Sequence, residues 1–314
     1  MGTYIAARIA QAVPVLVLAS VAVFLVLRLV PGDPAVSLAG ENAAPERIAE
    51  IRRQLGLEAS WPEQYVRWLG AVIQGDLGTS FRTGLTVKRM LELALPPTVE
   101  LALVAYPLAV LVGIPLGVAA GVAPRSVWDW LLSGYTLLTL GLPNFLLGIL
   151  LLWLFAVELG WFPAAGRVAL LADPVEALRR LTLPALALGS GLAAVLARYT
   201  RTAVQETMGQ DFIRTARAKG LSEFAVVVRH ALRGSLIPVV TIMGLQVGHV
   251  LAGAVVIEQV FTRPGLGRLI VEAIRFRDYP VVQGTLLVLV VIFLGVNLLA
   301  DLAYGLLDPR IRYR

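Results

Sequence analysis

Long runs of apolar residues are the feature that most restricts how this chain can fold. Residues 9–30, for example, contain Gln11 and Arg28 as their only strongly polar residues. An apolar run of about 20 residues is long enough to cross a bilayer as a helix. The chain of 314 residues is 58% hydrophobic and 15% charged, whereas soluble domains carry about 25% charged residues. The sequence therefore predicts an all-α polytopic membrane protein.

Six such runs predict six transmembrane helices. Their expected limits are residues 9–30, 98–122, 130–156, 181–200, 236–260 and 282–307. The first run is longer than the apolar core of a signal peptide and ends in Pro31-Gly-Asp-Pro34, so we expect an uncleaved span. Inside the third run, Gly141-Leu-Pro-Asn-Phe145 should kink or locally unwind the helix.

The segment that follows the first span is much more polar and predicts a helical subdomain outside the membrane. Residues 31–97 carry seven Lys or Arg and eight Asp or Glu residues. Residues 45–55 have an amphipathic pattern that stops at Gly56, and a second helix is expected from residue 61, with aromatic residues at helical spacing. These aromatic residues are Trp61, Tyr65 and Trp68. They indicate packing within the subdomain or contact with a partner protein.

The basic residues favour an orientation with both termini in the cytoplasm. With the long first loop left out, the segments on the side of the termini hold twelve Lys or Arg residues and the opposite loops hold seven. Short cytoplasmic loops are enriched in these residues. We therefore expect residues 1–30 to contain the first span, residues 31–97 to form an external subdomain, and residues 98–314 to form a five-helix core with a cytoplasmic loop at 201–235.

The loop between the fourth and fifth spans predicts two short helices. Asp211 and Gly220 suit the ends of the first helix, because an acidic residue favours a helix N-terminus and glycine favours the left-handed cap. Ser222 should cap the second helix, which we expect to end near Gly234. The basic residues around the loop are Arg214, Arg217, Lys219, Arg229 and Arg233, and the small ones that leave its first helix slim are Ala216, Ala218 and Gly220. Such a loop docks on another protein or lies on anionic lipid headgroups.

The same loop carries a resemblance to a known family. Arg214-Thr-Ala216, followed after three residues by Gly220 and then by Arg229-His-Ala-Leu-Arg233, resembles the coupling loop of ABC-importer permeases of the dipeptide/oligopeptide type. The usual form of the signature has Glu at 214, Ala at 215, Ile at 230 and Pro at 233, so this chain departs from it. Further similar motifs are Leu29-Val-Pro-Gly-Asp-Pro34, Gln74-Gly-Asp-Leu-Gly78, Arg263-Pro-Gly-Leu-Gly267 and Leu307-Asp-Pro-Arg-Ile-Arg312. The resemblance extends over essentially the whole chain.

The resemblance implies the permease subunit of an ATP-driven, binding-protein-dependent importer of short peptides in a bacterial or archaeal cell membrane. Its partners would be a second permease, two cytoplasmic ATPases and an extracytoplasmic solute-binding protein. The residues it assigns to ATPase coupling are Arg214, Thr215, Ala216, Arg217, Ala218, Lys219, Gly220 and Leu221. The chain has no Walker A pattern, so ATP and Mg²⁺ would be bound by the ATPases and no cofactor by this chain. The same architecture could import nickel, glutathione or oligosaccharides.

Polar residues inside the predicted spans are candidates for a translocation path. Asn144, Gln246 and His249 lie deepest in the apolar runs. Polar groups in lipid usually face a bundle interior or water. Hydrogen bonding between helices, or snorkelling to the interface at span ends, is the alternative role, and it is the preferred one for Arg198, Glu258 and Asp301 near span ends.

Other classes of function lack their sequence patterns. An intramembrane enzyme needs a constellation such as His-Glu-x-x-His or Gly-x-Ser-x-Gly, which is absent. An ion-coupled secondary transporter usually has mid-membrane acids and inverted repeats, which we do not find. The chain has no cysteine and two histidines, which disfavours a metal site. No basic patch with interleaved aromatic residues points to nucleic acid.

Overall fold

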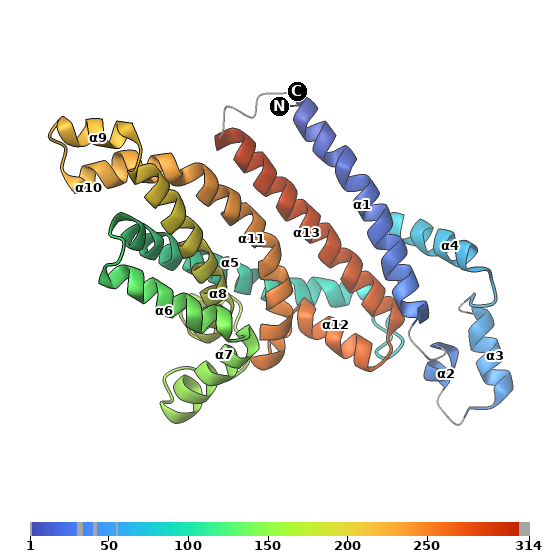
Figure 1. Cartoon of the computed structure of the whole chain (residues 1–314). Coiled ribbons are helices and arrows are strands. Elements are labelled where there is room, and N and C mark those ends of the chain that lie inside the picture. The colour runs from blue at the N-terminus through green and yellow to red at the C-terminus, as the bar shows by residue number, and fades with distance from the viewer. Residues whose placement is uncertain (1, 30–33, 40–42, 55, 308–314) are drawn as a thin grey trace. The chain divides into compact units, whose positions relative to one another are not determined.

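The computed structural model describes residues 2–29, 34–39, 43–54 and 56–307, and these residues form helices and connecting loops without a β-strand (Figure 1). The α-helices are α1 (Gly2–Leu29), α2 (Pro34–Ala39), α3 (Pro45–Gln54), α4 (Trp61–Ile73), α5 (Val87–Val122), α6 (Val127–Gly141), α7 (Asn144–Leu151), α8 (Pro174–Met208), α9 (Asp211–Ala218), α10 (Glu223–Val226), α11 (Leu232–Val260), α12 (Leu266–Arg275) and α13 (Tyr279–Leu307). Two π-helical segments, η1 (Leu152–Glu158) and η2 (Val227–Ala231), continue α7 and α10. The chain divides into two compact units, one of Met1–Pro96 with Pro264–Gly295 and one of Pro97–Arg263 with Val296–Arg314.

The first unit contains the polar helices that follow α1. Helix α3 ends at Gln54, and Gly56 has the positive φ of 65° expected for a helix stop. Helix α4 begins at Trp61 and packs on α1, where the Tyr65 hydroxyl forms a 2.8 Å hydrogen bond with Ser20 Oγ. The rings of Tyr65 and Trp68 contact Phe24, whereas Trp61 is exposed. Two of the three predicted aromatic residues therefore pack within this unit.

A second contact in this unit joins segments about 200 residues apart in the sequence. The buried carboxylate of Asp278 accepts hydrogen bonds from Ser80 Oγ at 2.5 Å and from the backbone N–H of Phe81 at 3.1 Å. The first turns of α5 pack on α12 and the start of α13 around a buried apolar cluster. Its buried members are Val87, Leu91, Ala94, Leu266, Ala273, Tyr279, Val281 and Val282.

The second unit is built around α8, which packs against α6, α7 and α11. Its seam with α5 is unusually close, because glycines of α5 recur every fourth residue. A Cβ atom added to Gly113 would lie 2.8 Å from the carbonyl oxygen of Ala193, and one added to Gly117 would lie 2.5 Å from that of Ala197. Small residues at this spacing let helix backbones approach each other closely. No larger side chain fits at these glycines without moving α5 away from α8.

The number of spans agrees only in part with the sequence-based prediction. Among the described residues, four helices are long and apolar enough to cross a membrane: Val87–Val122, Pro174–Met208, Glu223–Val260 and Tyr279–Ala300. A fifth span is formed if α6 and α7–η1 count together, although the axis bends by 102° between them. The apolar part of α1 is the shorter stretch Ala10–Leu25. The predicted total of six is therefore not confirmed, whereas the break expected at residues 141–145 is present.

Candidate functional site

The predicted coupling loop forms a helical hairpin in the second unit. Helix α9 begins at Asp211 and ends at Ala218, and Gly220 follows with φ of +80°, a conformation that glycine adopts at least cost. The Ser222 hydroxyl then accepts a 3.4 Å hydrogen bond from the N–H of Ala225 and caps α10. These are the helix ends that the acidic residue, the glycine and the serine predict.

A small apolar core holds the two arms of this hairpin together. Ile213 and Ala216 of α9 pack on Val226 and Ala231 of the second arm, and all four are buried. Ala216 therefore lies inside the hairpin, so the expectation that it contributes to a slim outer face is wrong. The outer surface is formed by exposed residues on both sides of the turn. These are Arg214, Thr215, Arg217, Ala218, Lys219 and Gly220, with Leu221 partly buried behind them.

An ion pair across the turn fixes the exposed side of the hairpin. Arg217 donates to both carboxylate oxygens of Glu223, with Nε–Oε1 at 2.7 Å and Nη2–Oε2 at 3.1 Å. This hydrogen bonding raises the pKa of the Arg217 guanidinium further, so its charge persists at every physiological pH. The Arg214–Asp211 pair is longer, at 3.4 Å, and fully exposed. Of these two pairs, Arg217–Glu223 is the one with the bidentate geometry that orders a side chain.

The second arm of the hairpin does not end where the sequence predicts. Gly234 suggested a helix stop, but α10, η2 and α11 are continuous from Glu223 to Val260, a helix of 38 residues. A Cβ atom on Gly234 would lie 2.7 Å from Thr207 Cγ2 of α8. This glycine is therefore needed for close helix packing rather than for a turn. As a consequence, the hairpin and a membrane-length helix form one continuous body.

Two aromatic residues of the hairpin were not identified from the sequence. Phe224 is 79% exposed and Phe212 is 46% exposed. Phe224 lies in the first turn of α10, two residues before the buried Val226, so the two side chains point to opposite faces. Exposed aromatic residues beside arginines are typical of protein interfaces. The sequence signal that could have identified Phe224 as exposed is its position two residues before the apolar Val226, which places the two side chains on opposite faces of the helix.

The three predicted pathway residues occupy different environments. Gln246 of α11 is buried and donates a 3.1 Å hydrogen bond to the carbonyl oxygen of Leu192 on α8. Asn144, at the start of α7, lies beside Gly191 and Gly253, the first on α8 and the second on α11. His249 is exposed and its Nδ1 lies 3.1 Å from the Leu245 carbonyl oxygen. Gln246 thus links two helices, and His249 faces out of this chain.

A buried charge cluster lies at the opposite end of α11 from the hairpin. Glu258 is 0% exposed and accepts a 2.5 Å hydrogen bond from Thr98 Oγ1, and the neighbouring Arg263 is 1% exposed. Arg263 Nη2 lies 3.5 Å from Glu100 Oε2. Glu100 also accepts two hydrogen bonds from Arg167, at 2.6 and 3.0 Å. The interhelical role expected for Glu258 is confirmed in this contact, and the cluster ties α5, α11 and the loop before α8 together.

These helices define an all-helical membrane protein that presents a basic hairpin at one end of its core. Comparison with known proteins places the chain in a family. It belongs to the binding-protein-dependent transport system inner membrane components, whose model matches residues 113–313, and the N-terminal model of the same family matches residues 1–102. The chain is thus a permease component and not an ATPase, and the system also includes a separate binding protein and an ATPase.

Relatives of this chain match it over their whole length and carry related names. A putative peptide transport system permease protein of Brucella abortus (strain 2308) is 44% identical over 100% of both chains. The glutathione transport system permease protein GsiC of Salmonella paratyphi A is 42% identical over 100% of both chains. The dipeptide transport system permease protein DppB of Alkalihalophilus pseudofirmus is 37% identical over 100% of both chains.

Proposed function

We propose that this chain is one permease subunit of an ATP-driven importer of short peptides, and that the α9–α10 hairpin couples it to a cytoplasmic ATPase. The observation that carries the proposal is the continuous helix Glu223–Val260, which makes the hairpin an extension of a membrane-length helix. Displacement of the hairpin by a partner would move that helix as a body. The names of the relatives support a peptide substrate, since glutathione is itself a short peptide.

The assembly that this function requires has further parts. A second permease would complete the translocation path, two ATPases would bind ATP and Mg²⁺, and an extracytoplasmic binding protein would deliver the peptide. The excess of basic residues on the side of the hairpin supports a cytoplasmic location for it and for both termini. The polar helices α3 and α4 would then lie outside the cell. We assign Asn144, Gln246 and His249 to the candidate path between the two permeases.

Replacing Gly220 tests the coupling role most directly. Gly220→Val places a β-branched residue at φ of +80°, which costs about 1–2 kcal/mol, although the added Cβ meets no atom within 4 Å. We expect the complex to assemble and hydrolyse ATP while peptide uptake falls at least tenfold. Gly160→Val is the matched control, because Gly160 also has positive φ and open space but lies outside the hairpin. Unchanged peptide-stimulated ATPase activity and uptake for Gly220→Val would refute the assignment.

Exchanging charges distinguishes two roles for Arg217, namely contact with the ATPase and the internal ion pair with Glu223. Arg217→Glu removes the ion pair with Glu223 and reverses the surface charge. The double variant Arg217→Glu with Glu223→Arg restores an internal pair but keeps the reversed charge at position 217. If Arg217 contacts the ATPase, attachment measured at several salt concentrations should stay weak in the double variant. Full recovery would mean that Arg217 serves only the internal pair.

The absence of cysteine makes the orientation easy to test. Ala218→Cys introduces a single thiol at an exposed position of the hairpin. In intact cells an impermeant thiol reagent should leave it unlabelled, and permeabilised cells should allow labelling. Labelling of intact cells would place the hairpin outside and overturn the proposed orientation.

A further inference from the structure

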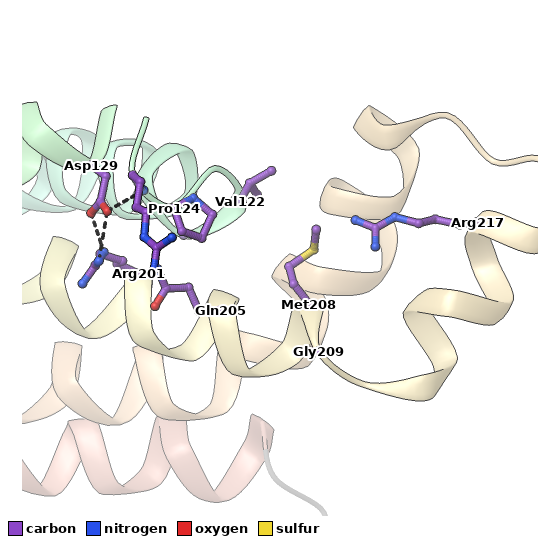
Figure 2. Close-up of a pocket in the computed structure, with 10 residues that line it drawn as sticks. Val122, Pro124, Asp129, Arg201, Gln205, Met208, Gly209 and Arg217 are labelled. Atoms are coloured by element: carbon purple, nitrogen blue, oxygen red, sulfur yellow. Dashed lines mark hydrogen bonds and ion pairs between the residues drawn. The ribbon is translucent and has the colours of Figure 1, made fainter. Parts of the chain in front are cut away.

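A hollow of about 590 Å³ lies beside the hairpin, within the second unit (Figure 2). It opens between the α5–α6 turn, the last turns of α8 and the outer arm of the hairpin. The residues that line it and matter here are Arg125, Asp129, Arg201, Gln205, Met208 and Arg217. In Figure 2, Arg217 lies across the hollow from Asp129 and Arg201, with Met208 and Gly209 between them. No described residue occupies this space.

Three local features hold the walls of the hollow in place. Asp129 forms a bidentate ion pair with Arg201, with Nε–Oδ1 at 2.7 Å and Nη2–Oδ2 at 3.1 Å. The same carboxylate accepts a 2.9 Å hydrogen bond from the backbone N–H of Arg125. At Gly121 the helices α5 and α8 approach so closely that a Cβ atom would lie 2.9 Å from the Arg201 carbonyl oxygen. The turn and the end of α8 are therefore fixed relative to each other.

The charge of the hollow is positive and only partly compensated. Three arginines from three different elements line it, and Asp129 is its only acidic residue. Asp129 is neutralised by Arg201, and Arg217 is neutralised by Glu223. Arg125 is exposed, and within the described part of the chain its guanidinium has no ion-pair partner. An arginine without a partner at the mouth of a hollow favours a carboxylate or phosphate ligand.

We propose that this hollow is a second contact for the cytoplasmic ATPase, which inserts an acidic side chain beside Arg125. The inference rests on the proposed coupling role of the hairpin, because Met208 and Arg217 connect the hollow directly to it. A protein that docks on the hairpin would cover the mouth of the hollow at the same time. A lipid phosphate is the competing ligand, but it would have to reach a site whose wall is the docking hairpin. The second contact would make the α5–α6 turn follow the ATPase together with α9.

The backbone of Arg125 provides an unusually clean pair of test variants. Its φ is +61°, a conformation that asparagine and aspartate adopt more readily than other non-glycine residues. Arg125→Asn and Arg125→Asp therefore fit the turn equally well and differ only in charge. We expect attachment of the ATPase to the purified permease complex to weaken about threefold for Asn and about tenfold for Asp. Arg125→Lys should retain most of the attachment, and the salt dependence should flatten in the Asn variant.

Each result separates this inference from the proposed function. If Arg125→Asp leaves ATPase attachment unchanged while Gly220→Val still uncouples transport, the second contact is refuted and the hairpin role stands. If attachment is unchanged but the complex in detergent binds added phosphatidylglycerol more weakly, with phosphatidylcholine as the uncharged comparison, the hollow is a lipid site and the inference is again refuted. If Gly220→Val and Arg125→Asp both leave coupled transport intact, the proposed function fails as well. Equal unfolding midpoints for the Asn and Asp variants serve as the control for folding.

Discussion

The second unit contains two charged regions that are built in opposite ways. In the buried cluster, Glu100 and Glu258 balance Arg167 and Arg263. Glu258 in α11 and Arg263 just after it are almost fully excluded from solvent. The hollow beside the hairpin is open, carries an excess of positive charge and, among the described residues, leaves the Arg125 guanidinium without an ion-pair partner. Charges that compensate each other inside a protein fasten its elements, whereas uncompensated exposed charges are available to a partner. The first region should therefore determine stability and the second should determine attachment.

The largest expected effect is the loss of one charge from the buried cluster. Arg263→Met leaves Glu100 and Glu258 in an apolar environment with less compensation, and breaking a buried pair in this way costs about 3–5 kcal/mol. Thermal or denaturant unfolding of the purified protein in detergent measures this loss. Arg47→Met is the control, because Arg47 forms only an exposed 3.4 Å pair with Glu50, of a kind worth about 0–1 kcal/mol. Equal losses of stability for the two variants would show that buried, mutually compensated charges stabilise the protein no more than exposed ones.

A smaller effect is expected in the seam that connects the two regions. Helix α5 runs from Glu100 in the cluster to Gly121 at the hollow, and its glycines contact α8 along the way. Gly117→Ala places a Cβ atom 2.5 Å from the Ala197 carbonyl oxygen, which should cost about 1–3 kcal/mol of stability. Gly134→Ala in α6 meets no atom within 4 Å and should instead stabilise by up to about 1 kcal/mol. The same sign for both substitutions would show that the seam is not tightly packed.

The smallest expected effect lies in the hairpin itself and is local. Ser222→Ala removes the cap of α10, which costs about 0.5–1 kcal/mol, at the low end because the hydrogen bond is 3.4 Å long. Hydrogen exchange of the amides at 223–226 should accelerate about two- to fivefold without a change in the global unfolding midpoint. Ser126→Ala is matched to it, since Ser126 precedes α6 but forms no cap hydrogen bond. In this variant the amides of the first turn of α6 should exchange at unchanged rates. A comparable acceleration there would contradict the capping argument.

The helix ends were the most predictable part of this fold. Gly56, Gly220 and Ser222 each act through their own backbone or side chain, so the sequence around them is sufficient to predict a stop or a start. The break at Leu142-Pro143 is likewise local, because proline cannot continue the hydrogen-bond pattern of α6.

Features that depend on a distant neighbour were not predictable in the same way. The sequence around Gly234 predicts a helix end, but in the structure Gly234 packs closely against Thr207 of α8. Which residue lies beside Gly234 is determined by tertiary packing. Arg263 appears in the sequence only as part of a motif, and its burial beside Glu100 depends on a residue 163 positions earlier. The hollow has the same origin, since its walls come from three separate elements. Local chemistry predicted the hairpin of the candidate site, whereas tertiary packing determined what surrounds it.

The buried charge cluster also has a consequence for how the chain enters the membrane during synthesis. A helix inserted alone pays about 2.5–3.5 kcal/mol for each charged residue near its centre. Glu100 is made 67 residues before its closer partner Arg167 and more than 150 residues before Arg263, so its ion pairs form in two steps as these later segments are synthesised. The order of translation is therefore coupled to charge pairing. In a variant that loses Arg263, Glu100 would keep Arg167 as its ion-pair partner once synthesis is complete.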